Sequence, residues 1–139
     1  MVSLSEHKRT LGISVGTVGI LVSDKNKAKQ WYHEKLGMEI LKDDGHWVTV
    51  GRRGRGAELH LCQADELEPK LDLEPSEQGI NLITEENLDE VHRILLRRGV
   101  EFEKPPFKTR WGWGSSIRDP DGNILYLVHE DQDREASCL

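Results

Sequence analysis

The sequence has few cysteines, no long basic run and no long apolar run. Its two cysteines, Cys62 and Cys138, are too few for a disulfide framework, which favours a reducing compartment and predicts a cytoplasmic protein. The formal net charge of -6 argues against nucleic acid as the main partner, because phosphate binding needs clustered Lys and Arg. No segment approaches the ~20 apolar residues of a membrane span, so no membrane partner is expected.

The only dense basic spot consists of Arg52, Arg53 and Arg55, with glycines among them. This composition is typical of a solvated hairpin tip, and contact with an anion is the alternative. The length of 139 residues and the hydrophobic content of 36% fit a single domain with its own core.

The same order of elements occurs twice along the chain. Hydrophobic spacing, caps and turn residues predict helices at 24–36 and 87–98 and strands at 14–22, 38–42, 46–50, 57–63, 80–84, 100–103, 112–118 and 124–129. Pro105 and Pro106 are expected to interrupt the chain between two of these strands. The repetition predicts an α+β fold of two βαβββ modules, with a mixed eight-stranded cup-shaped sheet and helices on its convex face.

The repeat also sets the expected domain boundaries. Residues 13–130 are expected to form one domain, with module one at 13–63, a linker at 64–78 and module two at 79–130. A flexible N-terminal arm is expected at 1–12 and a polar C-terminal tail at 131–139.

Two segments carry a family resemblance. Near the end of the chain, Asp119-Pro120-Asp121-Gly122-Asn123 leads into Ile124-Leu125-Tyr126-Leu127, and near its start Val22-Ser23-Asp24 is followed by Trp31-Tyr32 and Leu36-Gly37. In these segments the chain resembles the vicinal oxygen chelate superfamily, which includes glyoxalase I, bleomycin-resistance proteins and extradiol dioxygenases. The resemblance spans about residues 13 to 130. It implies a homodimer, because cups of this superfamily usually lie at or near a two-fold contact.

Alternation along the strands separates the two faces of the sheet. Apolar rows that include Ile20, Leu59, Leu61, Leu125 and Leu127 are expected to pack on the helices. The side chains expected to point into the cup are Thr17, Glu58, His60, Cys62, Ile124, Tyr126 and Val128.

The resemblance also implies where a divalent ion would bind. Superfamily enzymes take one ligand from the first strand and one from the last strand of each module. In module one these positions carry over to Thr17 and Glu58. In module two they carry over to Tyr126 and to Ile80, or by a slip of register to Gly79 or Gln78.

Among these residues Glu58 is the only strong ligand, whereas a stable transition-metal site needs three or four. We therefore expect no cofactor. A divalent metal at a displaced site built on Glu58 and His60 is the alternative.

Without a metal, the cup becomes a concave, partly aromatic pocket, which is the usual form of a small-molecule site. The candidate ligand-binding residues are Thr17, Trp47, Trp111, Trp113 and Tyr126, with Glu58 and His60 as candidate polar or catalytic groups. For Trp47, a position in the core is an equally good alternative. For Trp111 and Trp113, the alternative is that they pack over the end of the sheet without contacting a ligand.

Three functions fit these residues. The first is a binding protein of the bleomycin-resistance kind, which holds an aromatic or apolar molecule without chemistry. The second is an acid–base lyase or isomerase with Glu58 as general base and His60 or Tyr126 as its partner. The third is a metal-dependent lyase or dioxygenase with a displaced site. The shortage of metal ligands favours the first, and the sequence leaves open which molecule is bound and whether any reaction follows.

Overall fold

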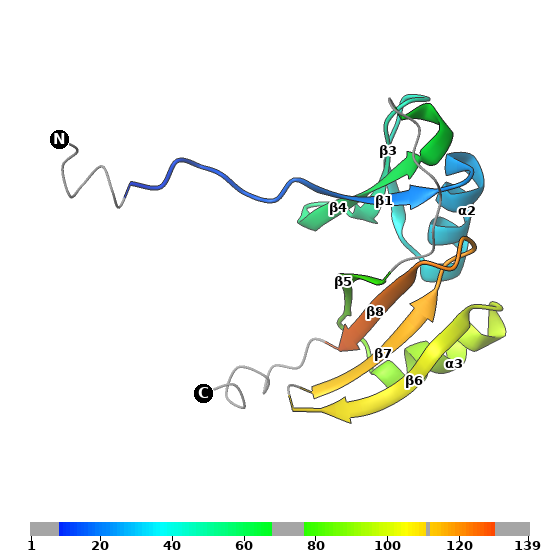
Figure 1. Ribbon diagram of the computed structural model, residues 1–139. Coiled ribbons are helices and arrows are strands. Elements are labelled where there is room, and N and C mark those ends of the chain that lie inside the picture. The colour runs from blue at the N-terminus through cyan, green and yellow to red at the C-terminus, as the bar shows by residue number, and fades with distance from the viewer. Residues whose placement is uncertain (1–8, 68–76, 111, 130–139) are drawn as a thin grey trace.

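The computed structural model describes residues 9–67, 77–110 and 112–129 (Figure 1). Its elements are β1 (Thr17–Val22), α2 (Lys25–Leu36), β2 (Glu39–Asp43), β3 (Val48–Arg52), β4 (Arg55–Gln63), the 3-10 turn η1 (Ala64–Glu66), β5 (Glu77–Thr84), α3 (Leu88–Arg97), β6 (Glu101–Thr109), β7 (Gly112–Arg118) and β8 (Ile124–His129). No helix among these residues is long and apolar enough to cross a membrane.

The strands form two sheets of four, in the orders β1-β4-β3-β2 and β5-β8-β7-β6. In each sheet the first pair, β1 with β4 and β5 with β8, is parallel and the other neighbours are antiparallel. This arrangement confirms the α+β fold of two βαβββ modules. Within the described ranges the hydrogen-bonded ladders stay inside each module, so the eight strands are two sheets side by side rather than one continuous ladder.

Local signals explain both helices, whose predicted positions are confirmed to within a residue. The Asp24 carboxylate accepts hydrogen bonds from the backbone N–H groups of Asn26 and Lys27 and so caps α2. Gly37 ends this helix in the left-handed conformation, with a φ of 72°. The Asn87 side chain caps α3 in the same way, accepting from the first turn.

The strands differ most from the prediction at three places, and the other boundaries shift by at most two residues. β1 begins at Thr17, because residues 14–16 extend beyond the ladder with β4, in which Glu58 is the partner of Thr17. β5 begins at Glu77, inside the predicted linker, and residues 68–76 of that linker lie outside the described ranges. The predicted interruption at Pro105 and Pro106 is wrong, since β6 runs through both. This is possible because β6 is the edge strand of its sheet, and register shifts around Lys104 absorb the missing donors.

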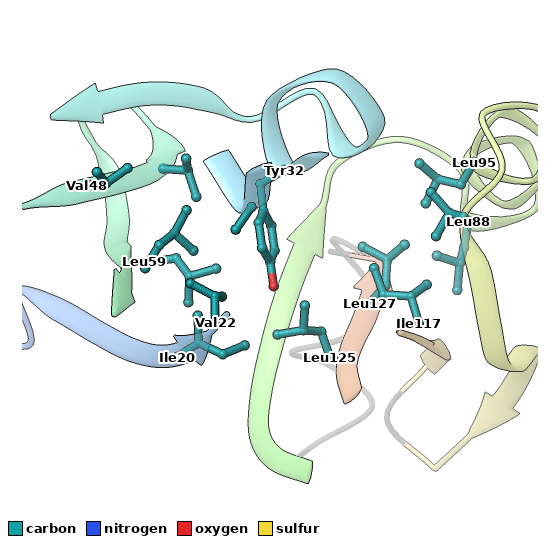
Figure 2. Packing of buried hydrophobic residues seen from close by; sticks show 14 residues of the cluster. Ile20, Val22, Tyr32, Val48, Leu59, Leu88, Leu95, Ile117, Leu125 and Leu127 are labelled. Carbon is teal, nitrogen blue, oxygen red and sulfur yellow. The ribbon is translucent and has the colours of Figure 1, made fainter. Parts of the chain in front are cut away.

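The core lies between the sheets and the helices and confirms the predicted apolar faces. Leu61 and Leu125 are fully buried, as is the Tyr32 ring on α2. Figure 2 shows this ring between Val22 of the first module and Leu125 of the second. Tyr32 therefore belongs to both halves of the core.

Polar contacts join the two modules at three places. At one end the turn at 119–123 is bound to module one, where Tyr32 Oη donates to Asp119 Oδ2 over 2.9 Å and Asn123 Nδ2 donates to the carbonyl of Leu21 over 2.9 Å. At the helix ends, Arg98 Nη1 donates to the carbonyl of Lys35 over 3.0 Å.

At the other end, Glu85 of module two pairs with Arg52 and Arg55 of the β3–β4 hairpin. Arg53 pairs with Glu39 at 3.6 Å. All three arginines of the basic spot therefore face carboxylates of this chain, as structural ion pairs at a hairpin tip.

Candidate functional site

The helix-free face of the first sheet gathers four of the predicted site residues. Thr17 of β1 is in register with Glu58 of β4, and Gly19 is in register with His60. These residues alternate with Leu59 and Leu61, which are buried against the helix side. Trp47 lies just before β3. By strand alternation it is on the same face as Thr49, whose partner on β4 is His60.

Trp47 and His60 form a stacked pair on this face. Their ring centroids lie 3.6 Å apart with an interplanar angle of 24°. Trp47 is nevertheless 39% exposed, so much of the indole remains open to a ligand. The sequence allowed Trp47 to lie either in the core or in the cup. In the structure it lies on the helix-free face, which is the face predicted for the cup.

Glu58 is held by a neighbour that the sequence analysis overlooked. Thr49 Oγ1 donates a hydrogen bond to Glu58 Oε1 over 2.6 Å, and Thr49 is fully buried. Alternation along β3 predicts that Thr49 lies on the same face as Trp47, so the sequence already contained this signal. A buried donor fixes the orientation of this half-buried carboxylate and leaves its second oxygen for another partner.

Cys62 extends the same row of side chains beyond His60. Its Sγ lies 3.2 Å from His60 Nδ1, and both residues are half-buried. Burial lowers the pKa of His60 below its usual range. Burial also raises the pKa of the Cys62 thiol, against the smaller opposing effect of a hydrogen bond with the Ile20 backbone. Both shifts favour the uncharged forms at neutral pH.

In module two, Tyr126 lies in register with Asn81 of β5 and with Ser116 of β7. The first-strand neighbour of Tyr126 is therefore Asn81 and none of the three residues that the sequence analysis considered, Gln78, Gly79 and Ile80. Ser116 Oγ donates to Glu103, which brings a second hydroxyl–carboxylate pair to this sheet.

The structure does not bring Trp113 together with the other predicted walls. Trp113 has the parity of Ser115, which donates to the carbonyl of Leu127 on the helix side. Its indole, 46% exposed, borders a cavity of about 50 Å³ with Asn87 and His129 at the start of α3. Trp111 lies outside the described residues.

The residues at the metal positions of the resemblance do not fit a transition-metal ion. The two strand pairs supply Thr17 with Glu58, and Asn81 with Tyr126, which makes one carboxylate and one amide oxygen besides hydroxyls. Across the described ranges, no three side chains of His, Cys, Asp or Glu gather closely enough to hold a metal ion.

A cleft of about 810 Å³ opens between the modules, within the size range of small-molecule sites. Its apolar walls include Val18, Leu36 and Leu59 from module one and Leu82, Val91 and Leu127 from module two. Glu58, Asn81 and Ile83 bring the helix-free faces of both sheets to it. Of the predicted site residues that the structure describes, Glu58 alone lines this cleft, while Trp47 and His60 lie on the same helix-free face as Glu58 without lining the cleft.

Comparisons with known proteins agree with the fold. Residues 14–127 match the family model of the Glyoxalase/Bleomycin resistance protein/Dioxygenase superfamily. The uncharacterized protein YetH of Bacillus subtilis is 32% identical over 120 residues, which cover 81% of this chain and 95% of YetH.

The chain is also similar in fold and sequence to proteins of known structure. A superfamily member from Sphaerobacter thermophilus is 33% identical with a TM-score of 0.76, over 87% of this chain and 100% of its own. TnmS3, an antibiotic binding protein from Streptomyces sp. CB03234, is 29% identical with a TM-score of 0.72, over 88% of this chain and 100% of its own. With its two βαβββ modules and this family match, the chain belongs to the Glyoxalase/Bleomycin resistance protein/Dioxygenase superfamily.

Proposed function

We propose that this protein binds an aromatic or apolar organic molecule on the helix-free face beside the inter-module cleft, without a transition metal. The observation that carries the proposal is the partly exposed Trp47, held in place by its stack on His60. A fixed aromatic surface, on a face that reaches an apolar cleft at Glu58, favours flat organic ligands, because it offers much apolar area and few polar groups that need partners. The likeness to TnmS3, an antibiotic binding protein, supports the same reading.

The experiment is a screen of flat organic compounds by tryptophan fluorescence and thermal shift. A bound ligand raises the melting temperature through binding linkage and quenches the exposed indole. A broad screen without a single hit would contradict the proposal.

An acid–base enzyme is the second candidate, since the hydrogen bond from Thr49 orients Glu58 at the edge of the cleft. Glu58→Gln separates it from a binding protein, because glutamine keeps the acceptor for Thr49 and loses the base. We expect the affinity for a neutral ligand to stay within about twofold, as the carboxylate charge contributes little to a neutral partner. An enzyme would instead keep this affinity and lose turnover by about 100-fold or more.

Elemental analysis of the purified protein tests the expected lack of a metal cofactor. We expect well under one equivalent of Zn, Ni, Mn or Fe per chain, because Glu58 is the single strong ligand among the family positions Thr17, Glu58, Ile80 and Tyr126. Asn81, the strand partner of Tyr126, adds only an amide oxygen. A stoichiometric metal that Glu58→Gln removes would favour the metal-dependent enzyme instead.

A homodimer is part of the proposal, and the segment before β1 supports it. Residues 9–16 run away from the sheets (Figure 1), and Leu11, Ile13 and Val15 are 69%, 86% and 71% exposed. Three apolar side chains in alternation are costly in water and suit a strand buried against a second copy.

We expect light scattering to give a dimer mass at micromolar concentration for the native chain and a monomer mass for the triple variant Leu11→Ser, Ile13→Ser, Val15→Ser. The matched control is Leu96→Ser, which removes an exposed leucine from α3. A native monomer would contradict this expectation. The cytoplasmic location remains a prediction.

A further inference from the structure

Glu58 is a half-buried carboxylate that lines the inter-module cleft without a cationic partner in the described part of the chain. Its Oε1 accepts the hydrogen bond from Thr49 Oγ1, and its Oε2 has no hydrogen-bond partner among the described residues. Within the same ranges no Lys or Arg forms an ion pair with it. A carboxylate that is partly removed from water is costly unless a donor, and above all a cation, pairs with it.

The other charged side chains of the cleft differ from Glu58. Glu39 and Glu85 form ion pairs with arginines of the β3–β4 hairpin, and Glu86 is exposed, so water solvates its charge. The cationic side chains that line the cleft already have partners within the chain: Arg52, Arg55 and Arg98. Glu58 is therefore the carboxylate of the cleft that a bound cation would satisfy.

Apolar and aromatic surface lies on both sides of this carboxylate. The cleft that Glu58 lines has apolar walls such as Val18 and Leu82. Along β4, His60 follows two residues after Glu58 on the same face, at a spacing of about 7 Å, and Trp47 stacks on it. Two fused aromatic rings with a charged group one carbon away are long enough to cover the indole and reach Glu58.

We propose that the ligand is an aromatic amine in its protonated form, and that Glu58 Oε2 binds its ammonium group. The inference rests on the small-molecule binding function proposed above and narrows it to aromatic cations. An ammonium group donates up to three hydrogen bonds, and its charge strengthens the bond to a carboxylate. The indole face of Trp47 also attracts a cation. The net charge of -6 favours the approach of a cation over that of an anion.

Two naphthalenes of nearly the same shape test the role of the charge. At pH 7, 2-(aminomethyl)naphthalene is a cation and 2-(hydroxymethyl)naphthalene is neutral. Isothermal titration calorimetry on the full chain at low ionic strength gives both affinities. We expect the amine to bind about tenfold more tightly than the alcohol, because a charge-assisted hydrogen bond is roughly twice as strong as a neutral one.

Glu58→Gln tests whether this carboxylate is the source of the preference. Glutamine keeps an acceptor for Thr49 and removes the charge, so the affinity for the amine should fall about tenfold and that for the alcohol should stay within about twofold. Glu34→Gln is the matched control, since it gives the same net charge by removing an exposed glutamate of α2. It should leave both affinities within about twofold. Melting curves confirm that each variant is folded.

Equal affinities of the native protein for the amine and the alcohol overturn the inference and leave the binding function standing, and this comparison needs no variant. An equal loss of amine affinity in Glu58→Gln and Glu34→Gln also overturns it, because the preference would then come from the net charge. If neither naphthalene binds, the inference is overturned as well, and the screen of flat compounds decides separately on the binding function.

Discussion

Replacing Asp119 with alanine is expected to lower the free energy of unfolding by about 3 kcal/mol, because this carboxylate links the two modules. Its Oδ2 accepts hydrogen bonds from Tyr32 Oη and Asn123 Nδ2, each over 2.9 Å. Its Oδ1 accepts from the backbone N–H groups of Asp121 and Asn123. Alanine would leave several of these donors buried without a partner. Urea unfolding at pH 7 measures the loss.

Two other variants show whether the position of the carboxylate matters. Tyr32→Phe removes one of the four donors and should cost about 1 kcal/mol. Asp65→Ala is the matched control, because Asp65 is an exposed aspartate that accepts from Gln63 on the surface. Equal urea midpoints for Asp119→Ala and Asp65→Ala would contradict the linking role of the turn.

The effect of Asp119→Ala on the free energy of unfolding should depend on pH, and the direction of this dependence can be predicted. Burial raises the pKa of Asp119, against opposing hydrogen bonds from Asn123 and Tyr32. The folded state then holds the proton more tightly than the unfolded chain, so this contribution to stability is fully present below about pH 4 and is lost as the pH rises through the folded pKa. The difference in stability between the native protein and Asp119→Ala should therefore be larger at about pH 4.5 than at pH 7.

The parts of the fold that were predicted from the sequence depend on neighbouring residues. Asp24 and Gly37 mark the ends of α2 through contacts within a few positions. The burial of Leu61 and the position of His60 on the opposite face follow from alternation along one strand. Such signals act within one element, so a single sequence contains them.

The parts that were missed depend on pairing between distant residues. The family resemblance implied Ile80 as the first-strand position of module two, but the pairing of β5 with β8 sets the register, and it places Asn81 beside Tyr126. The inter-module cleft has walls from both modules, which are joined by contacts such as Tyr32 with Asp119, 87 residues apart. Trp113 is a different case, because it shares the strand parity of Ile117, an apolar residue that the structure buries on the helix side.

Trp47→Ala is expected to weaken the binding of a flat aromatic ligand about 10- to 100-fold, or about 1.5 to 3 kcal/mol, through the loss of apolar contact area. The indole stacks on His60 with one face and is 39% exposed, so a ligand on the helix-free face would cover it. Titration of tryptophan fluorescence gives the affinity. The ligand-induced quenching should decrease strongly in this variant, because the indole nearest to the ligand is gone.

Trp113→Ala is the matched control, because Trp113 is 46% exposed but lies on the helix side beside Asn87 and His129. Its removal should leave the affinity within about twofold, because a side chain on the helix side of the second sheet makes no contact with a ligand on the helix-free face of the first. The reverse pattern, with weak binding in Trp113→Ala and normal binding in Trp47→Ala, would move the site to the start of α3. Since both variants remove the same side chain at similar exposure, a difference between them reports whether the ligand lies on the helix-free face of the first sheet or beside the start of α3.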